Sequence, residues 1–214
     1  MTENSNINPK GRATTLDVML DALPDYETPL GVDSRAVKGI TADSRAVVPD
    51  AMFVAVRGVA VDGHKFIDKA LVAGATTIVC EEIPENADSK AVYVRVADSR
   101  DALGRLASRF YGDPSDELTL VGVTGTNGKT TIATLLYEVA RLRGHKAGLI
   151  STVANIIDGD SRPAEHTTPD PVQLNALLRS MVDAGCTFAA MEVSSHACDQ
   201  HRIAGLTFAG GIFT

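Results

Sequence analysis

The feature that most constrains this chain is a glycine-rich segment, TGTNGKTT, at residues 124–131. It follows LTLVGV, a run of apolar β-forming residues, and precedes IATLLYEVARLR, whose apolar residues recur at helical spacing. Gly125 and Gly128 would let backbone N–H groups approach a phosphate chain closely, and the N-terminus of the following helix would attract an anion. The segment therefore predicts a strand, a phosphate-binding loop and a helix.

Specific roles follow from this prediction. Lys129 is expected to reach the outer phosphates of a nucleotide, and the Thr130 hydroxyl is expected to bind Mg²⁺. The usual pattern has a glycine five residues before Gly128, where this chain has Val123, so the loop is a variant. An ordinary glycine-rich turn does not require Lys-Thr-Thr at this register, which favours nucleotide binding. The candidate nucleotide-binding residues are Gly125, Thr126, Asn127, Gly128, Lys129, Thr130 and Thr131.

The composition excludes several classes of protein. The chain has 214 residues, 44% of them hydrophobic, which is typical of one large or two small folded domains. A total of 20 Lys and Arg against 27 Asp and Glu gives a net charge of -7, which argues against a broad nucleic-acid-binding face. The polar N-terminus and the lack of a long apolar run argue against a signal peptide and a membrane span. Three scattered cysteines indicate reduced thiols and a cytoplasmic protein: Cys80, Cys186 and Cys198.

The order of elements indicates an α/β fold. We expect a flexible leader over 1–14, an N-terminal domain over 15–114 and a second domain over 116–214, with turn residues between the two domains. Asp98 or Ser99 is expected to begin a helix that runs to Phe110. In the second domain, strands alternate with helices, which predicts a mostly parallel sheet, and residues 158–170 are expected to form a polar loop. The chain stops at an apolar strand, so we expect a fragment of a longer protein.

Several ordered motifs resemble one enzyme family. TGTNGKTT is similar to the phosphate loop of the Mur ligases, which are ATP-dependent amide-forming enzymes. HTTPDP at 166–171 and MEVSSHACDQHR at 191–202 resemble the subfamily that adds the third amino acid of the peptidoglycan stem peptide. ITADSRAVVPDAMFVAVRGVAVDGHKFI at 40–67 is similar to the domain of that subfamily that holds the uridine nucleotide. Folylpolyglutamate synthases share the phosphate loop but are not expected to have the other motifs.

The resemblance implies two groups of substrate-binding residues. Ala42 and Ser44, with the loop Val59, Ala60 and Val61, would line the uridine pocket. That loop is more polar in relatives, so backbone contacts are expected there. Without the resemblance, Asp43-Ser44-Arg45 would be interpreted as a capped turn between strands. The residues expected to hold the muramoyl-dipeptide part are Asn155, Thr167, Thr168, Ser194, Gln200 and Arg202.

One carboxylate is a candidate metal ligand. Glu192 ends an apolar strand, the position at which active sites of open α/β sheets form, so it is expected to bind Mg²⁺ together with Thr130. Lys129 and Glu192 are therefore the candidate catalytic residues. The spacing of His196, Cys198 and His201 matches no familiar metal site, and the two histidines are interpreted as packing or supporting residues.

The resemblance implies an ATP- and Mg²⁺-dependent ligase for UDP-N-acetylmuramoyl-L-alanyl-D-glutamate, acting through an acyl phosphate. The expected fold is an N-terminal α/β uridine-nucleotide-binding domain followed by an incomplete P-loop-type sheet domain. The added amino acid is expected to be meso-diaminopimelate, otherwise L-lysine. Family members continue beyond this chain with a modified lysine and a C-terminal domain, so the fragment, expected to be monomeric, should be inactive alone. The alternatives are a folylpolyglutamate-synthase-like ligase and a non-catalytic nucleotide-binding module.

Overall fold

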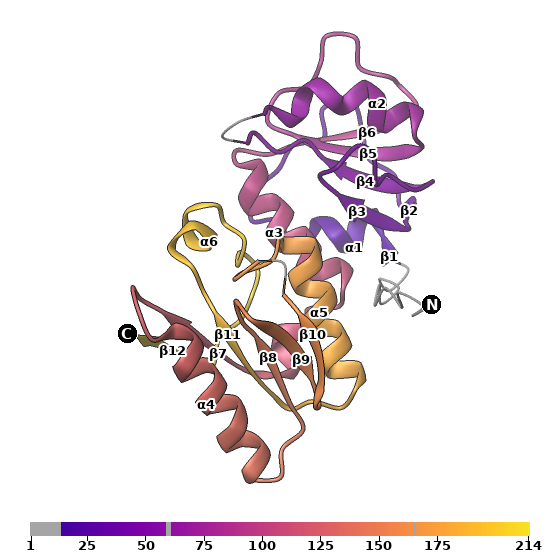
Figure 1. The fold of residues 1–214 in the computed structure, drawn as a ribbon. Helices are drawn as coiled ribbons and strands as arrows, with labels where there is room; N and C mark the ends of the chain where they lie inside the picture. Colours follow the sequence, from indigo (N-terminus) through magenta and orange to yellow (C-terminus); the bar gives the residue numbers. More distant parts are fainter. Residues whose placement is uncertain (1–13, 59–60, 165) are drawn as a thin grey trace, which may run out of the picture. The chain divides into compact units, whose positions relative to one another are not determined.

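The computed structural model describes residues 14–58, 61–164 and 166–214. These residues form two compact units, one ending at Gly112 and the other beginning at Asp113 (Figure 1). Of the expected leader, residues 1–13 lie outside the described residues, and Thr14 begins strand β1 (Thr14–Thr15). Within the described ranges, no helix has the length and apolar character needed to cross a membrane.

The first unit is built on a four-stranded parallel sheet. Its strands lie in the order β3 (Gly39–Thr41), β4 (Ala51–Val54), β5 (Ala75–Cys80) and β6 (Val92–Arg95). The 3-10 turn η1 (Gly63–Phe66) leads into helix α2 (Ile67–Val72), and the remaining helices are α1 (Leu16–Leu20) and α3 (Ser99–Phe110). Strand β1 forms an antiparallel pair with β2 (Ala36–Val37).

Hydrophobic burial fixes this first sheet. Every residue of β4 is buried, as expected for a parallel strand that is covered on both faces. Phe53, Ile78 and Tyr93 pack in one cluster with Ile67 of α2. Asp98 caps α3 by accepting hydrogen bonds from two backbone N–H groups of its first turn, which confirms the expected start of this helix.

The second unit contains a six-stranded, mostly parallel sheet. Its strands lie in the order β10 (Asp160–Pro163), β9 (Ala154–Ile157), β8 (Ala147–Ile150), β11 (Phe188–Glu192), β7 (Thr119–Thr124) and β12 (Gly210–Phe213). The 3-10 turn η2 (Pro114–Glu117) precedes β7, and the helices are α4 (Lys129–Leu142), α5 (Pro171–Asp183) and α6 (Ser195–Asp199). The expected α/β class with a mostly parallel second sheet is confirmed.

Two helices cover the second sheet with separate apolar clusters. Tyr137 and Ala133 of α4 pack against Val123, Leu149 and Ala190 of the central strands. The other cluster joins α5 to the same strands, since the side chains of successive strand residues point to opposite faces. Its members include Leu174, Leu178, Met181, Leu120, Ile150, Ala189 and Met191. Strands β7, β8 and β11 are therefore held from both sides, which fixes their carboxyl ends.

The expectation of a polar loop over 158–170 is wrong for its first residues. Strand β10 lies within this segment and pairs antiparallel with β9. Asp158 and Gly159 between them have φ angles of 47° and 95°. Positive φ at both central residues is the geometry of a type I′ hairpin turn, for which Asp-Gly is a preferred pair. Because most side chains of β10 are polar, the sequence did not indicate this exposed edge strand.

The close packing of α5 on β8 gives a stability prediction. A Cβ atom at Gly148 would lie 2.3 Å from the sulfur of Met181, which is fully buried. We expect Gly148→Ala to lower the free energy of unfolding by about 1–3 kcal/mol, because the methyl group would overfill the core. Gly210→Ala is the matched control, since a Cβ there meets nothing within 4 Å. Equal urea midpoints for the two variants would contradict this packing.

Candidate functional site

The phosphate-loop segment connects β7 to α4, as its sequence predicted. Gly125 and Gly128 have φ angles of 134° and 85°, which explains why glycine occupies both positions. A Cβ atom at Gly125 would lie only 2.0 Å from the carbonyl oxygen of Thr214. The loop is therefore closely packed on one side.

Lysine 129 is the first residue of α4, and its ammonium group lies over the loop. Lys129 Nζ donates to the carbonyl oxygen of Gly125 at 2.8 Å. Among the described residues, no side chain caps the N-terminus of α4, whereas Asp98 and Asp170 cap α3 and α5. The first N–H groups of α4 are thus left for another acceptor, and the helix dipole favours an anion there.

Glu192 lies at the carboxyl end of β11, beside the start of this loop. In the parallel ladder it is opposite Val123, two residues before Gly125. Its side chain is buried, with 1% relative exposure. The backbone N–H of Thr152 donates to Oε1 at 2.8 Å, and the Thr152 hydroxyl donates to Oε2 at 3.2 Å. An acidic group is therefore held at the strand edge where open α/β sheets bind ligands.

Threonine 168 joins the expected dipeptide-binding residues to Glu192. Thr168 Oγ1 donates to the backbone carbonyl oxygen of Glu192 at 3.0 Å and accepts from the backbone N–H of Ser194 at 3.2 Å. Arg202 Nη1 donates to the carbonyl oxygen of Thr168 at 2.8 Å. Gln200 Oε1 accepts from Arg202 Nη2 at 2.7 Å, which orients the guanidinium group. Residues from three segments thus form one connected network around the end of β11.

Two further expected residues differ in their relation to this network. The Thr167 hydroxyl oxygen lies 3.1 Å from that of Thr152, so Thr167 belongs to the network. Asn155 lies on β9, opposite Ile150 in the ladder. Its Oδ1 atom is buried and has no hydrogen-bond partner among the described residues. The expected dipeptide group is therefore brought together except for Asn155.

Sequence reasoning missed Thr152, although it contacts both oxygens of Glu192. The available signal was its place directly beyond the buried strand β8, because carboxyl ends of neighbouring parallel strands meet at one edge. Thr152 and Glu192 are 40 positions apart and do not lie in the same sequence motif. Thr152 is itself exposed, so its role is visible only from its hydrogen bonds.

The residues expected at the uridine pocket lie in the first unit. Ala42 and Ser44 follow β3, in a turn in which Asp43 accepts hydrogen bonds from the backbone and guanidinium groups of Arg45. These bonds lower the pKa of Asp43 to about 2. Val61 is exposed, whereas Val59 and Ala60 lie outside the described residues. The turn is locally fixed by its own ion pair.

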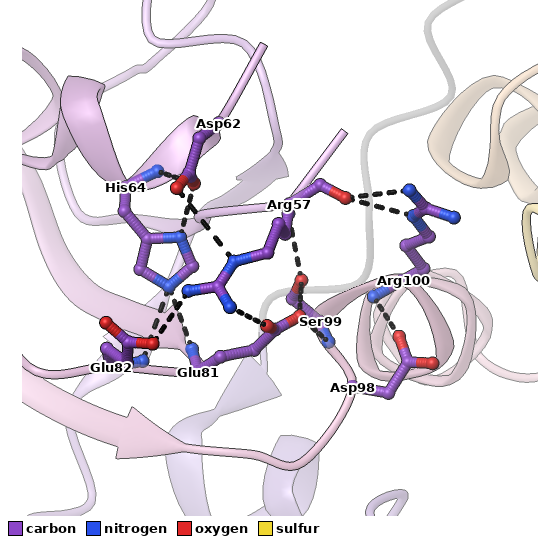
Figure 2. A network of polar contacts seen from close by, with 8 residues as sticks. All are labelled: Arg57, Asp62, His64, Glu81, Glu82, Asp98, Ser99 and Arg100. Atoms are coloured by element: carbon purple, nitrogen blue, oxygen red, sulfur yellow. Dashed lines mark hydrogen bonds and ion pairs between the residues drawn. The ribbon is translucent and has the colours of Figure 1, made fainter. Parts of the chain in front are cut away.

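The loop that carries Val61 is anchored at its base by Arg57 and Asp62, which form an antiparallel backbone bridge. Their side chains form an ion pair, with 3.9 Å between Arg57 Nε and Asp62 Oδ2 (Figure 2). The Arg57 guanidinium donates to Glu82 at 3.0 Å and lies 3.4 Å from Glu81. The backbone N–H of Arg57 donates to Ser99 Oγ at 3.1 Å. The loop base is therefore tied both to the end of β5 and to the start of α3.

Histidine 64 completes this anchor, and its contacts define its tautomer. Its Nε2 atom accepts a hydrogen bond from the backbone N–H of Glu81 at 3.0 Å. The ring proton therefore lies on Nδ1, which is 2.7 Å from Asp62 Oδ1 and donates to it. Hydrogen bonds from the backbone and ring of His64 lower the pKa of Asp62 (Figure 2). A neutral imidazole thus bridges the loop and β5.

The cluster expected to have no metal role lies on or beside α6. Within the described ranges, no group of three His, Cys, Asp or Glu side chains is arranged to hold a metal ion. His196 and His201 are both exposed, which contradicts a packing role for them; the alternative, a supporting role, stays a prediction. Cys198 is also exposed, whereas Cys80 and Cys186 are buried.

Thiol reactivity tests this placement. Burial raises the pKa of Cys80 to about 12 and also raises that of Cys186, so neither supplies a thiolate near neutral pH. We expect an aromatic disulfide reagent at pH 8 to modify Cys198 rapidly and the other two thiols only after denaturation. Cys198→Ser is the control and should remove the fast phase. Fast modification of Cys80 in the native protein would contradict the structure.

Models of known protein families match segments of both units. The Mur ligase middle domain matches residues 123–214, and the family described as "Mur ligase family, catalytic domain" matches residues 36–111. The chain belongs to the Mur ligase family.

Eight similar curated relatives carry the name UDP-N-acetylmuramoyl-L-alanyl-D-glutamate--2,6-diaminopimelate ligase. The protein from Parabacteroides distasonis is 57% identical over 196 residues, which are 91% of this chain and 40% of the relative. The protein from Bacteroides thetaiotaomicron is 56% identical over 183 residues, 85% of this chain and 38% of the relative. The chain thus spans about 40% of the length of the curated relatives it matches.

Two solved structures likewise match most of this chain and less than half of their own length. A ligase structure with that name has a TM-score of 0.74 and 25% identity, over 91% of this chain and 39% of the other. The MurF ligase from Thermotoga maritima in complex with ADP has a TM-score of 0.50 and 28% identity, over 75% of this chain and 34% of the other.

Proposed function

We propose that this chain is the N-terminal and part of the central region of an ATP-dependent ligase. The ligase would join meso-diaminopimelate to UDP-N-acetylmuramoyl-L-alanyl-D-glutamate during peptidoglycan precursor synthesis. The observation that carries the proposal is the buried Glu192 carboxylate beside a phosphate loop, in a residue whose backbone carbonyl oxygen accepts a hydrogen bond from Thr168 of the motif HTTPDP. The names of relatives at 56–57% identity support this substrate and favour diaminopimelate over L-lysine.

The residues present fit Mg-ATP. Gly125 and Gly128 leave the loop backbone without Cβ atoms, and the first N–H groups of α4 have no side-chain cap among the described residues. The loop residues Gly125 to Thr131 would bind the phosphates, with Lys129 exchanging its present carbonyl partner for a phosphate oxygen. Thr130 and Glu192 supply the oxygen ligands that Mg²⁺ prefers. The ADP complex of a structural relative supports this nucleotide.

The chemical task of these residues is to bring two anions together. In the proposed reaction the substrate carboxylate attacks the γ-phosphorus of ATP and displaces ADP. The amine then attacks the carbonyl carbon of the resulting acyl phosphate, forming the amide and releasing inorganic phosphate and a proton. Both partners of the first step are negative, so their repulsion has to be offset. Lys129 and the N-terminus of α4 place positive charge there, and bound Mg²⁺ would add more. Positioning and charge neutralisation are therefore the contributions of this chain.

The network around Thr168 is suited to the dipeptide end of the substrate. Hydroxyl and amide groups of Thr167, Ser194 and Gln200 can satisfy peptide N–H and carbonyl groups. The Arg202 guanidinium, already oriented by Gln200, can pair with a carboxylate. Asn155 is proposed to contribute its buried Oδ1 atom, which has no hydrogen-bond partner among the described residues, to the same subsite.

The uridine end is proposed to bind in the first unit. Ala42 and Ser44 would contact it from the turn after β3, and Val59, Ala60 and Val61 would do so through the backbone. The contacts among Arg57, Asp62 and His64 support this role, because they hold the described residues on either side of that loop together. Domains over 15–114 and 116–214, a monomeric state and a cytoplasmic location belong to the same proposal, as does inactivity of this chain alone.

Nucleotide binding is tested at Lys129. We expect Lys129→Ala to lower the affinity for Mg-ATP at least tenfold, the loss of about 1.4 kcal/mol or more that follows from removing a charged hydrogen bond to phosphate. Calorimetric titration measures it. Lys146→Ala is the control, because Lys146 pairs with Asp158 at the amino end of β8, whereas the phosphate loop follows the carboxyl end of β7. Unchanged affinity in Lys129→Ala would contradict the loop assignment.

Substrate identity is tested by titrating the chain with UDP-N-acetylmuramoyl-L-alanyl-D-glutamate, with a folate as the competing ligand. We expect binding of the muramoyl dipeptide and none of the folate. Arg202→Ala and Ser44→Ala should each weaken binding, about tenfold for Arg202 because a charge-assisted contact is lost. Arg162→Ala, on the exposed strand β10, is the control. Folate binding without dipeptide binding would favour a folylpolyglutamate-synthase-like ligase instead.

A further inference from the structure

Threonine 152 lies in a tight turn whose shape is fixed by its neighbour. The turn connects the antiparallel strands β8 and β9, and the backbone N–H of Ser151 donates to the carbonyl oxygen of Ala154 at 3.1 Å. Ser151 is buried, and its hydroxyl donates to the same carbonyl oxygen at 2.8 Å. It also accepts from the backbone N–H of Ala154 at 3.1 Å. The backbone of Thr152 is therefore held in one position at the sheet edge.

From this position Thr152 donates hydrogen bonds to both oxygens of the Glu192 carboxylate. Its N–H donates to Glu192 Oε1 at 2.8 Å and its hydroxyl to Oε2 at 3.2 Å. The terminal torsion of a glutamate side chain is broad, so a carboxylate at a strand end has no preferred plane of its own. Two donors from a single rigid residue define that plane. Each oxygen keeps a second lone pair for another partner.

We propose that Thr152 is a positioning residue, which orients Glu192 so that its carboxylate binds the Mg²⁺ of Mg-ATP. The inference rests on the proposed function, since it assigns Glu192 to the metal. Groups that hydrogen-bond to a metal ligand fix its orientation, and their removal commonly weakens metal binding by about 10- to 100-fold. Glu192 is only 1% exposed, whereas Thr152 is exposed. Thr152 therefore lies on the accessible side of the buried Glu192 carboxylate.

The hydroxyl of Thr152 has a second neighbour that the experiment has to separate. Its oxygen lies 3.1 Å from the Thr167 hydroxyl oxygen. A hydroxyl has one proton, so when Thr152 donates to Glu192 it accepts from Thr167. Removing the Thr152 hydroxyl therefore also changes the environment of Thr167. Titration of the muramoyl dipeptide without metal measures that effect by itself.

The test compares Thr152→Val with Thr152→Ser in the whole 214-residue chain. ATP binding is titrated calorimetrically over a range of Mg²⁺ concentrations and again with a chelator. We expect Thr152→Val to raise the Mg²⁺ concentration needed for half-maximal binding by about tenfold. Affinity for metal-free ATP should not change, whereas the melting temperature should fall slightly, because Glu192 Oε2 loses the Thr152 hydroxyl as its donor. Thr152→Ser should restore the wild-type Mg²⁺ dependence, because it keeps the hydroxyl.

Two further variants keep the test decisive. Thr152→Ala removes the same hydroxyl without adding a methyl group, so a folding defect specific to valine does not decide the outcome. Thr207→Val is the matched control: Thr207 is exposed, and its backbone N–H donates to Ser115 Oγ, next to the start of β7 and away from the phosphate loop. Thr207→Val should behave as the wild type in every titration.

A double-mutant cycle with Glu192→Gln separates positioning from general stabilisation. If Thr152 acts through Glu192, the change Thr152→Val should have no further effect on Mg²⁺ dependence in the Glu192→Gln background. An undiminished effect there, or an unaltered Mg²⁺ dependence in Thr152→Val alone, would overturn the inference. A Thr152→Val variant that loses as much affinity for metal-free ATP as for Mg-ATP, together with thermal stability, would also overturn the inference. A wild-type chain without Mg²⁺-dependent ATP binding would refute the proposed function itself, and with it this inference.

Discussion

The hydrogen bonds that hold the buried Glu192 carboxylate at the end of β11 are the constraint on which the second unit depends. A carboxylate with 1% exposure is costly to bury unless its oxygens have partners. Thr152 supplies both partners from the neighbouring strand end, and Thr168 binds the backbone carbonyl of the same residue. The threonine segment and the turn after β8 are therefore fixed relative to the phosphate loop. One acidic group organises three segments that are distant in sequence.

Burial of strands and helices explains why these segments meet there. Leu120, Ile150 and Met191 bury one face of the central strands against α5, while Val123 and Ala190 bury the other against α4. Parallel strands that are fixed in this way bring their carboxyl ends to one edge, where ligands of α/β proteins bind. The first unit uses the same principle with a smaller sheet. There the neutral His64 ring ties a loop base to β5.

The sequence predicted the features that depend on local pattern. The apolar run 118–123, the two glycines and the helical period after them defined the β7–loop–α4 unit, and Asp98 marked the start of α3. It did not predict β10, because an edge strand of polar residues has no apolar alternation, and the Asp158-Gly159 turn was overlooked. Nor did it predict Thr152, whose partner lies 40 residues away and is found only through the strand order.

A crystal structure of this chain with Mg-ADP would test the role of Glu192 most directly. We expect the nucleotide phosphates to lie on the backbone N–H groups of residues 125–131, with the Lys129 ammonium moved from the Gly125 carbonyl oxygen to a phosphate oxygen. We also expect Mg²⁺ on the Glu192 side of the loop, with both Thr152 hydrogen bonds to that carboxylate retained. A nucleotide bound elsewhere, or a metal ion that leaves Glu192 paired only with protein groups, would contradict the central role of this carboxylate.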